Sequence, residues 1–320
     1  LIKPKYLVRS IKPINDLLAI FEIRKIIKKI KPDIIHLNST KAGFIGSLAS
    51  IGKTHKTIYT VHGWVFNENL SNIKKSLYKL IEEWTAPLKN QIIILSDNDR
   101  DSGLNIGING KKLKLIPLGI ETDIKRLNKD QARKKISDII NIKLTNDEPV
   151  ILTIANFYKN KGLTYLIKAA NKITEENPSI KFIIIGDGKE KNNLTELIQK
   201  FNLNKNVFLV GKIKNASTLL PAANLFVLTS IKEGLPYTLL EAINYKVPII
   251  STKVGGVGSI IETNKSGLLI RPQNIDDIAE SIKKYLTDPK IFDLYALNAH
   301  NNNSDFSLKK MLEKTTKLYN

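Results

Sequence analysis

The 320-residue sequence contains no cysteine, one methionine and only four histidines. The absence of cysteine excludes disulfide bridges and thiolate metal sites, and the four histidines are too scattered in the sequence to predict a zinc site. No apolar run approaches the ~18 residues of a membrane-spanning helix, and we find no cleavable signal pattern. Hydrophobic residues make up 42% and charged residues 25%, which is typical of soluble globular proteins, so we expect a cytoplasmic protein.

Positive charge is in excess and is unevenly distributed along the chain. Lys and Arg number 50 against 30 Asp and Glu, which gives a net charge of +20. The part through Thr145 alone has 27 basic and 13 acidic residues, a net charge of +14. A basic N-terminal half of this kind could bind nucleic acid, anionic lipid or a phosphorylated substrate. The preferred interpretation is a Lys-, Asn- and Ile-rich composition bias spread over solvated surfaces.

Short apolar runs follow turn signals and alternate with amphipathic stretches along the whole chain. The expected strands are 33–37, 57–61, 91–95, 114–116, 150–154, 181–185, 207–210, 225–228, 247–250 and 267–270. The expected helices include 17–30, 73–86, 163–173, 194–201 and 306–319. This alternation predicts an α/β protein with parallel sheets.

The stretch 121–148 is dense in charge and contains no expected strand, so we place a domain boundary within it. We expect a first domain over residues 1–145, a second over 146–303 and a C-terminal helix within 304–320. The first residue is leucine, and the earliest expected strand begins only at residue 33. We therefore expect that the chain begins inside a longer protein and that its first domain lacks an initial strand.

The most informative segment runs from residue 224 to residue 252. An apolar run with the composition of a buried parallel strand enters a polar loop, and Pro236 then opens a helical pattern at a position that proline favours. Glu233 and Glu241 flank this helix start with seven residues between them. Because the N–H groups of a helix N-terminus bind anions, the two carboxylates could hold hydroxyls on either side of a bound phosphate. The segment therefore predicts a site for a sugar, a diphosphate and a ribose.

A purely structural interpretation of the two glutamates is also available. Glu233 could interact with the helix dipole, and Glu241 could be a solvated helical residue. Glu241, however, stands among Leu239, Leu240 and Ile243. Because an isolated carboxylate in apolar surroundings contributes little to packing, we prefer the functional interpretation.

Four weaker motifs lie where expected strands end, and the residues alone leave a structural and a functional interpretation open for each. They are His62-Gly63, Lys161-Gly162, Gly186-Asp187-Gly188 and the glycine-rich stretch 255–258. Ligands of open α/β sheets collect at the carboxyl ends of strands, but turns also carry these residues. No GxGxxG fingerprint and no GxxxxGK[ST] loop is present.

Two further patterns are interpreted structurally. Asp97, Asp99 and Asp101 are spaced like metal-binding pairs, yet they follow a strand at a helix start, where capping explains them. We predict no metal ion there. The basic stretch 17–31 could lie on a membrane surface, but an ordinary α/β helix is the preferred interpretation.

Taken in order, these motifs resemble the retaining, nucleotide-sugar-dependent glycosyltransferases of family four. Four segments carry the resemblance: PDIIHLNSTKAGFIGSLAS from Pro32, TVHGW from Thr60, IANFYKNKGLTYLIKAA from Ile154, and the Glu233/Glu241 segment, which matches the family's E-x7-E signature. The resemblance implies a GT-B fold, in which two facing Rossmann-like domains enclose a nucleotide-sugar cleft and a C-terminal helix crosses back to the first domain. It points to the enzymes of bacterial capsule, exopolysaccharide or O-antigen synthesis.

The resemblance also implies roles for individual residues. Glu241 would hold the ribose, Glu233 would contact the donor sugar, and Lys161 would neutralise the diphosphate in place of a metal ion, without any cofactor. His62 would reach the donor sugar from the other domain. The remaining expected contacts are Gly186 and Asn156 in the nucleotide site, Ile213 beside the base, and the backbone of Gly234, Leu235, Pro236, Tyr237 and Thr238 at the diphosphate.

The implied reaction moves a sugar, expected to come from a UDP-sugar, to a glycan or polyprenyl-linked saccharide acceptor. The acceptor hydroxyl would approach the face that the diphosphate leaves, so no protein nucleophile is needed. Binding of nucleic acid is not expected, whereas an anionic membrane surface on the inner face of the cell membrane is a further candidate partner.

The sequence departs from the family pattern at several positions. Asn156 stands where the family places an arginine that clamps the phosphates, Gly258-Ser259 replaces a Pro-Glu pair, and Leu118 replaces an asparagine. The family's first strand and its glycine-rich loop have no counterpart in this sequence. We therefore expect a fragment that binds the donor and whose catalysis is in doubt.

Two other classes of function are compatible with parts of the sequence. A phosphorylase or hydrolase of the same fold would use the two glutamates as an acid/base pair, but a glycosidase needs carboxyls that face one bond at ~5–9 Å. A non-enzymatic nucleic-acid or membrane binder would use the positive charge, but it would combine basic side chains with exposed aromatics. Aromatic residues make up only 7% of the chain.

Overall fold

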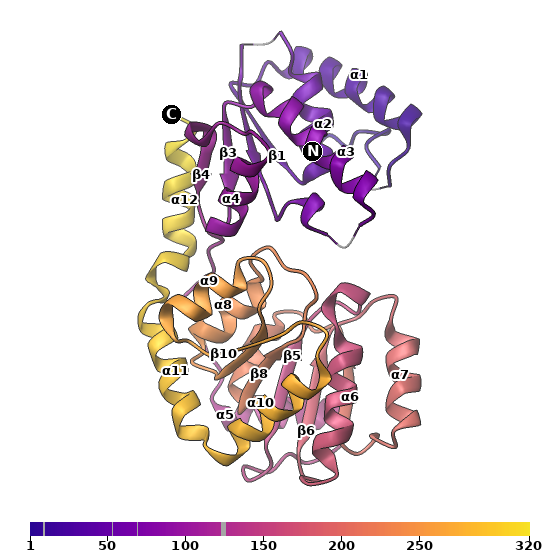
Figure 1. Cartoon of the computed structure of the whole chain (residues 1–320), viewed down its shortest axis with the longest axis vertical. Coiled ribbons are helices and arrows are strands. Elements are labelled where there is room, and N and C mark those ends of the chain that lie inside the picture. Colours follow the sequence, from indigo (N-terminus) through magenta and orange to yellow (C-terminus); the bar gives the residue numbers. More distant parts are fainter. Residues whose placement is uncertain (9, 53, 69, 123–125) are drawn as a thin grey trace. The chain divides into compact units, whose positions relative to one another are not determined.

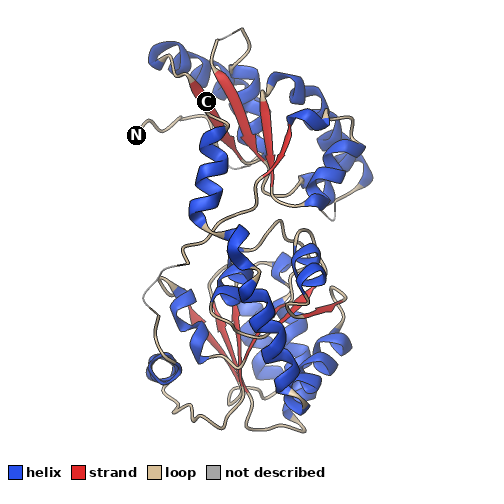
Figure 2. Cartoon of the chain, turned by 90° about the vertical axis from the view of Figure 1, so that its left-hand side faces the viewer, coloured by secondary structure: helices blue, strands red, loops and turns tan. Residues whose placement is uncertain are grey.

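The computed structural model describes residues 1–8, 10–52, 54–68, 70–122 and 126–320. The chain forms two compact units. The first unit contains Leu1–Pro117 together with Met311–Asn320, and the second contains Leu118–Lys310. Each unit is built around a parallel sheet with helices on both faces (Figures 1 and 2), which is the layered α/β architecture that the sequence predicts.

The first unit has a four-stranded parallel sheet in the order β1-β2-β3-β4. Its strands are β1 (Ile34–Asn38), β2 (Lys56–Thr60), β3 (Gln91–Ile94) and β4 (Leu113–Leu115). Its helices are α1 (Pro13–Ile30), α2 (Thr40–Ala49), α3 (Asn72–Thr85) and α4 (Asp97–Asn105), with short 3-10 turns η1 (Val65–Asn67), η2 (Ala86–Leu88) and η3 (Gly110–Lys112). Each strand feeds a helix that returns the chain to the next strand, as parallel pairing requires.

The two faces of the first sheet pack against different parts of the chain. On one face, Tyr59 contacts the α2 backbone at Gly43, and Tyr78 of α3 joins the same cluster of buried residues. On the other face, Ile58 and Ile93 pack against the C-terminal residues Met311, Leu318 and Tyr319. These C-terminal residues follow the first turn of α12 (Leu308–Lys317). The first unit is therefore assembled from both ends of the chain.

The second unit has a six-stranded parallel sheet in the order β10-β9-β8-β5-β6-β7. Its strands are β5 (Val150–Ile154), β6 (Lys181–Ile185), β7 (Val207–Gly211), β8 (Leu225–Leu228), β9 (Ile249–Thr252) and β10 (Leu268–Ile270). Its helices are α5 (Lys129–Ile140), α6 (Leu163–Thr174), α7 (Lys191–Lys200), α8 (Tyr237–Asn244), α9 (Val257–Asn264), α10 (Ile275–Thr287) and α11 (Pro289–Asn301), with η4 (Lys159–Lys161), η5 (Ala216–Ala222) and η6 (Asn303–Phe306).

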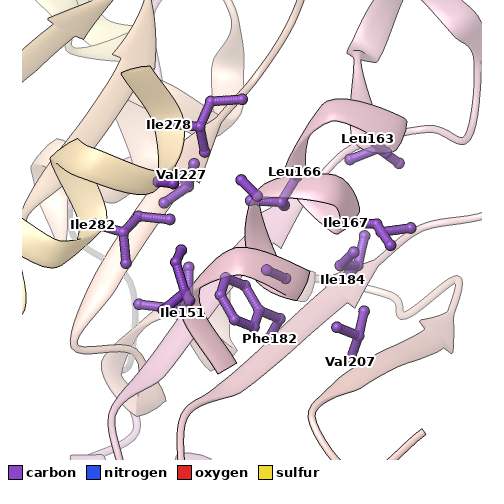
Figure 3. Close-up of a cluster of buried hydrophobic side chains, with 14 of the residues drawn as sticks. Ile151, Leu163, Leu166, Ile167, Phe182, Ile184, Val207, Val227, Ile278 and Ile282 are labelled. Carbon is purple, nitrogen blue, oxygen red and sulfur yellow. The ribbon is translucent and has the colours of Figure 1, made fainter. Parts of the chain in front are cut away.

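The packing of the second unit explains why the sequences of its strands are continuous apolar runs. On one face, Ile151, Phe182 and Val227 meet α6 and α10 through side chains such as Leu166 and Ile282 (Figure 3). The opposite face meets α5, η5 and α8. Because both faces are covered, every residue of β8 and β9 is buried.

The contact-based division of the chain falls at residues 117/118, earlier than the boundary expected after residue 145. The reason is the packing of α5 against η5. Arg133 of α5 is buried and donates to the carbonyl of Ala222 (3.2 Å) and to Oδ1 of Asn224 (2.7 Å), at the end of η5 and just before β8. The charge-dense stretch that the sequence places at a boundary thus belongs to the second unit.

Strand β9 begins two residues later than the sequence predicts. We expected a strand at 247–250, but β9 covers Ile249–Thr252. Ser251 and Thr252 are fully buried polar residues, and the Thr252 hydroxyl donates to the Ser230 carbonyl (2.6 Å). Hydropathy alone cannot identify a strand end whose polar side chains are satisfied inside the protein. Within the described residues, no helix combines the length and the apolar character that a membrane crossing requires.

Candidate functional site

The second sheet reverses its direction of winding between β5 and β8. The chain adds β6 and β7 on one side of β5, whereas β8, β9 and β10 extend the sheet on the other side. The loops that leave β5 and β8 at their carboxyl ends therefore diverge from a common point, where ligands of doubly wound sheets bind. Lys161 lies on the first of these loops and Glu233 on the second.

An ion pair joins the two loops at this point. Nζ of Lys161 lies 2.7 Å from Oε1 of Glu233, and the Ser230 hydroxyl donates to the same oxygen at 2.5 Å. The Glu233 side chain is 9% exposed and that of Lys161 is 20% exposed. The sequence predicted both residues as site residues but not their contact, because 72 positions separate them. Ser230 is a site residue that the sequence analysis missed.

Hydrogen bonds to backbone carbonyls hold the β5 and β8 loops together independently of this pair. The Ile231 amide donates to the Asn160 carbonyl at 2.8 Å, and the Thr229 hydroxyl donates to the Lys161 carbonyl at 3.2 Å. Gly162 has φ +63°, and a Cβ placed there would lie 2.1 Å from the Thr229 carbonyl oxygen. Only glycine combines this left-handed conformation with so close an approach. The glycine next to Lys161 is therefore a packing requirement of the site.

A second glycine fixes the other side of the β8 loop. Gly255 has φ +51°, and a Cβ there would lie 1.9 Å from the Glu233 carbonyl oxygen. The Gly256 amide donates to the Gly234 carbonyl at 2.8 Å. The stretch 255–258, which the sequence left open between a turn and a substrate loop, also contains the start of α9. It supports the Glu233 loop from the side of β9.

Helix α8 begins directly after this loop. Pro236 is its N-cap with an extended backbone, one position earlier than the first-turn position expected from the sequence. The first amides with an intrahelical bond are those of Leu239 and Leu240, which donate to the Pro236 carbonyl. The preceding amides of Tyr237 and Thr238 lie at the positive end of the helix dipole, where an anion is stabilised. Leu235 is buried and Gly234 half-buried, and both precede the helix on the Glu233 loop.

Glu241 lies on α8 one turn beyond its start and is half-buried. Burial raises the pKa of its carboxyl above the ordinary value, and a hydrogen bond from Ser217 of η5 partly offsets that rise. An environment that costs a carboxylate its hydration favours additional hydrogen-bond donors, such as a pair of hydroxyl groups. Ser217 is a second residue that the sequence analysis missed, because nothing in its neighbourhood distinguishes it from an ordinary helix-start serine.

The loops after β5, β6 and β7 form the neighbouring edge of the site. The Gly186 amide donates to the Gly211 carbonyl at 3.0 Å, and a Cβ on Gly186 would lie 1.9 Å from the Ala155 carbonyl oxygen. Gly186 is therefore needed for the close approach of two loops. Asn156 is exposed on the β5 loop, and Ile213 is half-buried two residues beyond β7.

In the first unit, His62 lies just past β2 at the carboxyl edge of that sheet. Its Nε2 is 3.3 Å from Oδ1 of Asn38, which ends β1. Desolvation lowers the pKa of His62 below the ordinary value, which favours the neutral ring at pH 7. Asn38 is the partner that the sequence analysis did not identify. His36 also has partners that the sequence could not reveal, namely Thr60 and Tyr319 at 2.7 Å each.

Two other expectations can be placed. Ser96 is the N-cap of α4 and accepts a hydrogen bond from the Asp99 amide, while Asp97 and Asp99 lie in the first turn. The stretch therefore lies at a helix start, as expected, but a serine caps the helix and not one of the aspartates. Among the residues that the structure describes, no group of three or more His, Asp or Glu side chains could hold a metal ion. The site in the second unit combines Lys161, the start of α8, the carboxylates of Glu233 and Glu241, and their hydroxyl partners.

Two family models match the sequence of the chain. The model described as "Glycosyl transferases group 1" matches residues 135–302, and the model described as "Glycosyltransferase Family 4" matches residues 2–124. The chain belongs to the group 1 glycosyl transferases. It is a glycosyltransferase with the GT-B fold, as the sequence resemblance predicted.

Curated relatives of this glycosyltransferase cover nearly all of the chain. It is 28% identical to the UDP-Gal:alpha-D-GlcNAc-diphosphoundecaprenol alpha-1,3-galactosyltransferase of Escherichia coli, over 98% of this chain and 81% of that protein. It is 26% identical to the capsular polysaccharide biosynthesis glycosyltransferase CapM of Staphylococcus aureus, over 98% of this chain and 83% of the relative.

Solved structures share the fold at lower identity. The Anabaena protein Alr3699/HepE in complex with UDP-glucose superposes with a TM-score of 0.82 at 20% identity, covering 96% of this chain and 84% of that chain. Sucrose-phosphate synthase from Thermosynechococcus elongatus gives a TM-score of 0.82 at 21% identity, over 97% of this chain and 79% of that chain. At these identities the likeness concerns the fold.

Proposed function

We propose that this glycosyltransferase moves a sugar from a UDP-sugar to a glycan or lipid-linked saccharide in the synthesis of a cell-surface polysaccharide, with retention of the anomeric configuration. The observation that carries the proposal is the Lys161–Glu233 pair beside the start of α8. A cation and free helix amides suit a diphosphate, and the adjacent carboxylate suits the hydroxyls of a sugar attached to it.

Relatives support the choice of donor and acceptor. The Escherichia coli relative is named for UDP-Gal and for a diphosphoundecaprenol-linked acceptor, and the HepE structure contains UDP-glucose. CapM is named for capsular polysaccharide synthesis. A polyprenyl-linked acceptor would lie at a membrane, so we place the enzyme at the cytoplasmic face of the cell membrane as a peripheral protein.

The proposed reaction uses the protein for charge stabilisation and positioning. The bond between the anomeric carbon and the diphosphate oxygen breaks, the acceptor oxygen bonds to that carbon on the same face, and the acceptor proton passes to a diphosphate oxygen. Lys161 and the amides of Tyr237 and Thr238 stabilise the charge that develops on the leaving diphosphate. Glu233 and His62 orient the donor sugar, and Glu241 accepts hydrogen bonds from the ribose.

The remaining assignments concern the nucleotide. Gly186 and Ile213 are assigned to the uridine side of the site, and Asn156 to the diphosphate side. Asn156 is uncharged, so this position contributes no cation of its own to the diphosphate. Lys161 then supplies the cationic side chain in the proposed donor site, and the helix start contributes the rest of the stabilisation.

Thermal unfolding with UDP, GDP and NAD, on the wild type and on Glu241→Ala, tests the proposal. A ligand at ~100 times its dissociation constant stabilises the folded state by about 2.7 kcal/mol. We expect a rise in Tm with UDP alone, and we expect Glu241→Ala to abolish it. A larger rise with GDP would overturn the choice of nucleotide, and no rise with any nucleotide would overturn the donor site. Product analysis by NMR with a UDP-sugar that supports turnover then tests retention at the anomeric carbon.

A further inference from the structure

Four hydroxyl side chains are buried where β5, β8 and β9 end, at the edge of the second sheet that carries the proposed donor site. Each is at most 1% exposed, and they are Thr153, Thr229, Ser230 and Thr252. A buried hydroxyl without a hydrogen-bond partner is unfavourable, so the partner of each side chain indicates what that residue does.

The hydroxyl of Ser230 has a different kind of partner from the other three. Those three donate to backbone carbonyls of a neighbouring strand or loop, at distances from 2.6 to 3.2 Å. Ser230 donates to a side-chain atom, Oε1 of Glu233, at 2.5 Å. Its loop is already held by the backbone, because the Ser230 carbonyl accepts from Thr252 and the Ile231 amide donates to the Asn160 carbonyl. The Ser230 hydroxyl is therefore available for the carboxylate of Glu233.

One oxygen of the Glu233 carboxylate receives both of the contacts that hold this side chain. Nζ of Lys161 lies 2.7 Å from Oε1, and the Ser230 hydroxyl donates to the same atom. Within the described residues, no donor contacts the other oxygen, Oε2. Rotation of the carboxylate would break both contacts at once, so Oε2 keeps one direction and can accept a hydrogen bond from a ligand.

The two donors to Oε1 differ in how they would respond to a diphosphate. Lys161 is a cation on a flexible stem and is 20% exposed, so its contact with Glu233 would weaken once the ammonium group also contacts the diphosphate. Ser230 is uncharged and fully buried. Its short hydrogen bond to the carboxylate has the length of a charge-assisted contact. Ser230 is therefore the donor whose hold on Glu233 does not depend on the diphosphate.

We propose that Ser230 is a positioning residue that acts through Glu233. Its hydroxyl fixes Oε1, so that Oε2 accepts a hydrogen bond from a hydroxyl of the donor sugar. The inference rests on the proposed function, since it states how the sugar part of the UDP-sugar is held while the diphosphate is bound. Ser230 itself touches neither the sugar nor the diphosphate, and its removal should affect the sugar part alone.

The variant Ser230→Ala tests this role by comparing UDP with a UDP-sugar. UDP lacks the sugar, so its dissociation constant, measured by isothermal titration calorimetry, should equal that of the wild type. The kcat/KM for a UDP-sugar that supports turnover should fall about tenfold, the usual effect of removing one hydrogen bond to a charged group. An unchanged kcat/KM, or an equal loss of affinity for UDP, would overturn the proposal.

Two matched variants separate the hydrogen bond from general stability and from side-chain volume. Thr153→Val removes a buried hydroxyl that donates to the Val227 carbonyl, so it should lower Tm and keep the kcat/KM of the wild type. Ser230→Cys fills nearly the same space with a weaker donor, so it should resemble Ser230→Ala. An equal loss of kcat/KM in Thr153→Val, or a wild-type value in Ser230→Cys, would overturn the positioning role.

A double-mutant cycle tests whether Ser230 acts through Glu233. In the Glu233→Ala background no carboxylate remains to be positioned, so Ser230→Ala should cause no further loss of kcat/KM. Transfer of a radiolabelled sugar would measure the four proteins of the cycle. Losses that multiply would show that Ser230 acts independently of Glu233 and would overturn the proposal.

The same measurements separate this inference from the proposed donor site. If the wild type binds no UDP, the proposed function fails and the role of Ser230 fails with it. If the wild type binds UDP and transfers the sugar, and Ser230→Ala does both equally well, only the positioning role is overturned.

Discussion

At the scale of single residues, the proposed role of Lys161 follows from the groups around its side chain. It lies between a carboxylate at 2.7 Å and the start of a helix, and its backbone carbonyl accepts from Thr229. A diphosphate at α8 would therefore meet a cation that Glu233 already orients. Because Glu233 is held in turn by Ser230, the pair can keep its position while the lysine gains a second anionic partner.

We predict that Lys161→Ala lowers sugar transfer by about 10²–10³-fold, the usual effect of removing one preorganised donor to a developing charge. Lys159→Ala is the matched control, since Lys159 is an exposed lysine of the same short helix. Steady-state rates with a donor that supports turnover would measure both variants. Equal losses in the two variants would show that general positive charge, and not the position of Lys161, stabilises the leaving group.

The sequence singled out these residues as candidates but did not reveal their contacts. Glu233, Glu241 and Lys161 stand out locally, because each combines an unusual neighbour with a strand end or a helix start. Ser217 and Asn38 became visible only in the structure, because their partners lie 24 positions away in the sequence. Hydrogen bonds between loops of different strands depend on topology, and a single sequence carries no direct record of them.

At the scale of elements, the strands were predicted well where both faces of the strand are buried. The expected runs 150–154, 181–185 and 225–228 coincide with β5, β6 and β8. Their residues are buried on both faces, so hydropathy and structure report the same property. The prediction was less accurate for β9, whose last two residues are polar and buried, and for the stretch 255–258, where α9 starts without a capping side chain.

The loop that precedes α6 requires a glycine at position 162. At Gly162 both the left-handed backbone and the 2.1 Å approach to Thr229 exclude a side chain. Gly52 shares the backbone conformation, with φ +73°, but has no atom within 4 Å of the position of a Cβ. The two glycines therefore separate the cost of the backbone conformation from the cost of the steric contact.

We predict that Gly52→Ala lowers the free energy of unfolding by about 1–2 kcal/mol, the cost of a left-handed alanine. Gly162→Ala should cost roughly 3 kcal/mol or more, because the β5 and β8 loops must also move apart. Chemical denaturation would measure both values. The UDP-induced rise in Tm should shrink in Gly162→Ala and stay unchanged in Gly52→Ala. Equal destabilisation by the two substitutions would contradict the tight packing at Thr229.

At the scale of the whole molecule, the first unit depends on residues from the far end of the chain. Met311, Leu318 and Tyr319 cover Ile58 and Ile93, and Tyr319 also contacts His36. These contacts close a loop of more than half the chain, which makes them costly in entropy. The sequence predicted a final amphipathic helix. Its docking on β1 to β3 is a long-range contact that helical periodicity does not specify, and only the family resemblance implied that this helix returns to the first domain.

The His36 contact makes this docking sensitive to acid. Nδ1 of His36 lies 2.7 Å from the Tyr319 hydroxyl and Nε2 lies 2.7 Å from the Thr60 hydroxyl. A neutral ring donates one of these hydrogen bonds and accepts the other, whereas a charged ring can only donate. Burial lowers the pKa of His36, and the neighbouring His62 lowers it further. The unfolded chain therefore binds a proton more readily than the folded one.

It follows that this histidine reduces the free energy of unfolding as the pH falls below ~6.5, and that its effect disappears at higher pH. Histidine ring resonances followed by NMR during a pH titration should give His36 a pKa below the ordinary value. Tyr319→Phe removes one hydroxyl and should cost about 1 kcal/mol near pH 7. The His36→Gln variant should show a shallower loss of stability in acid than the wild type. An ordinary pKa for His36, or an equally steep loss in His36→Gln, would contradict the burial that disfavours the charged ring of His36.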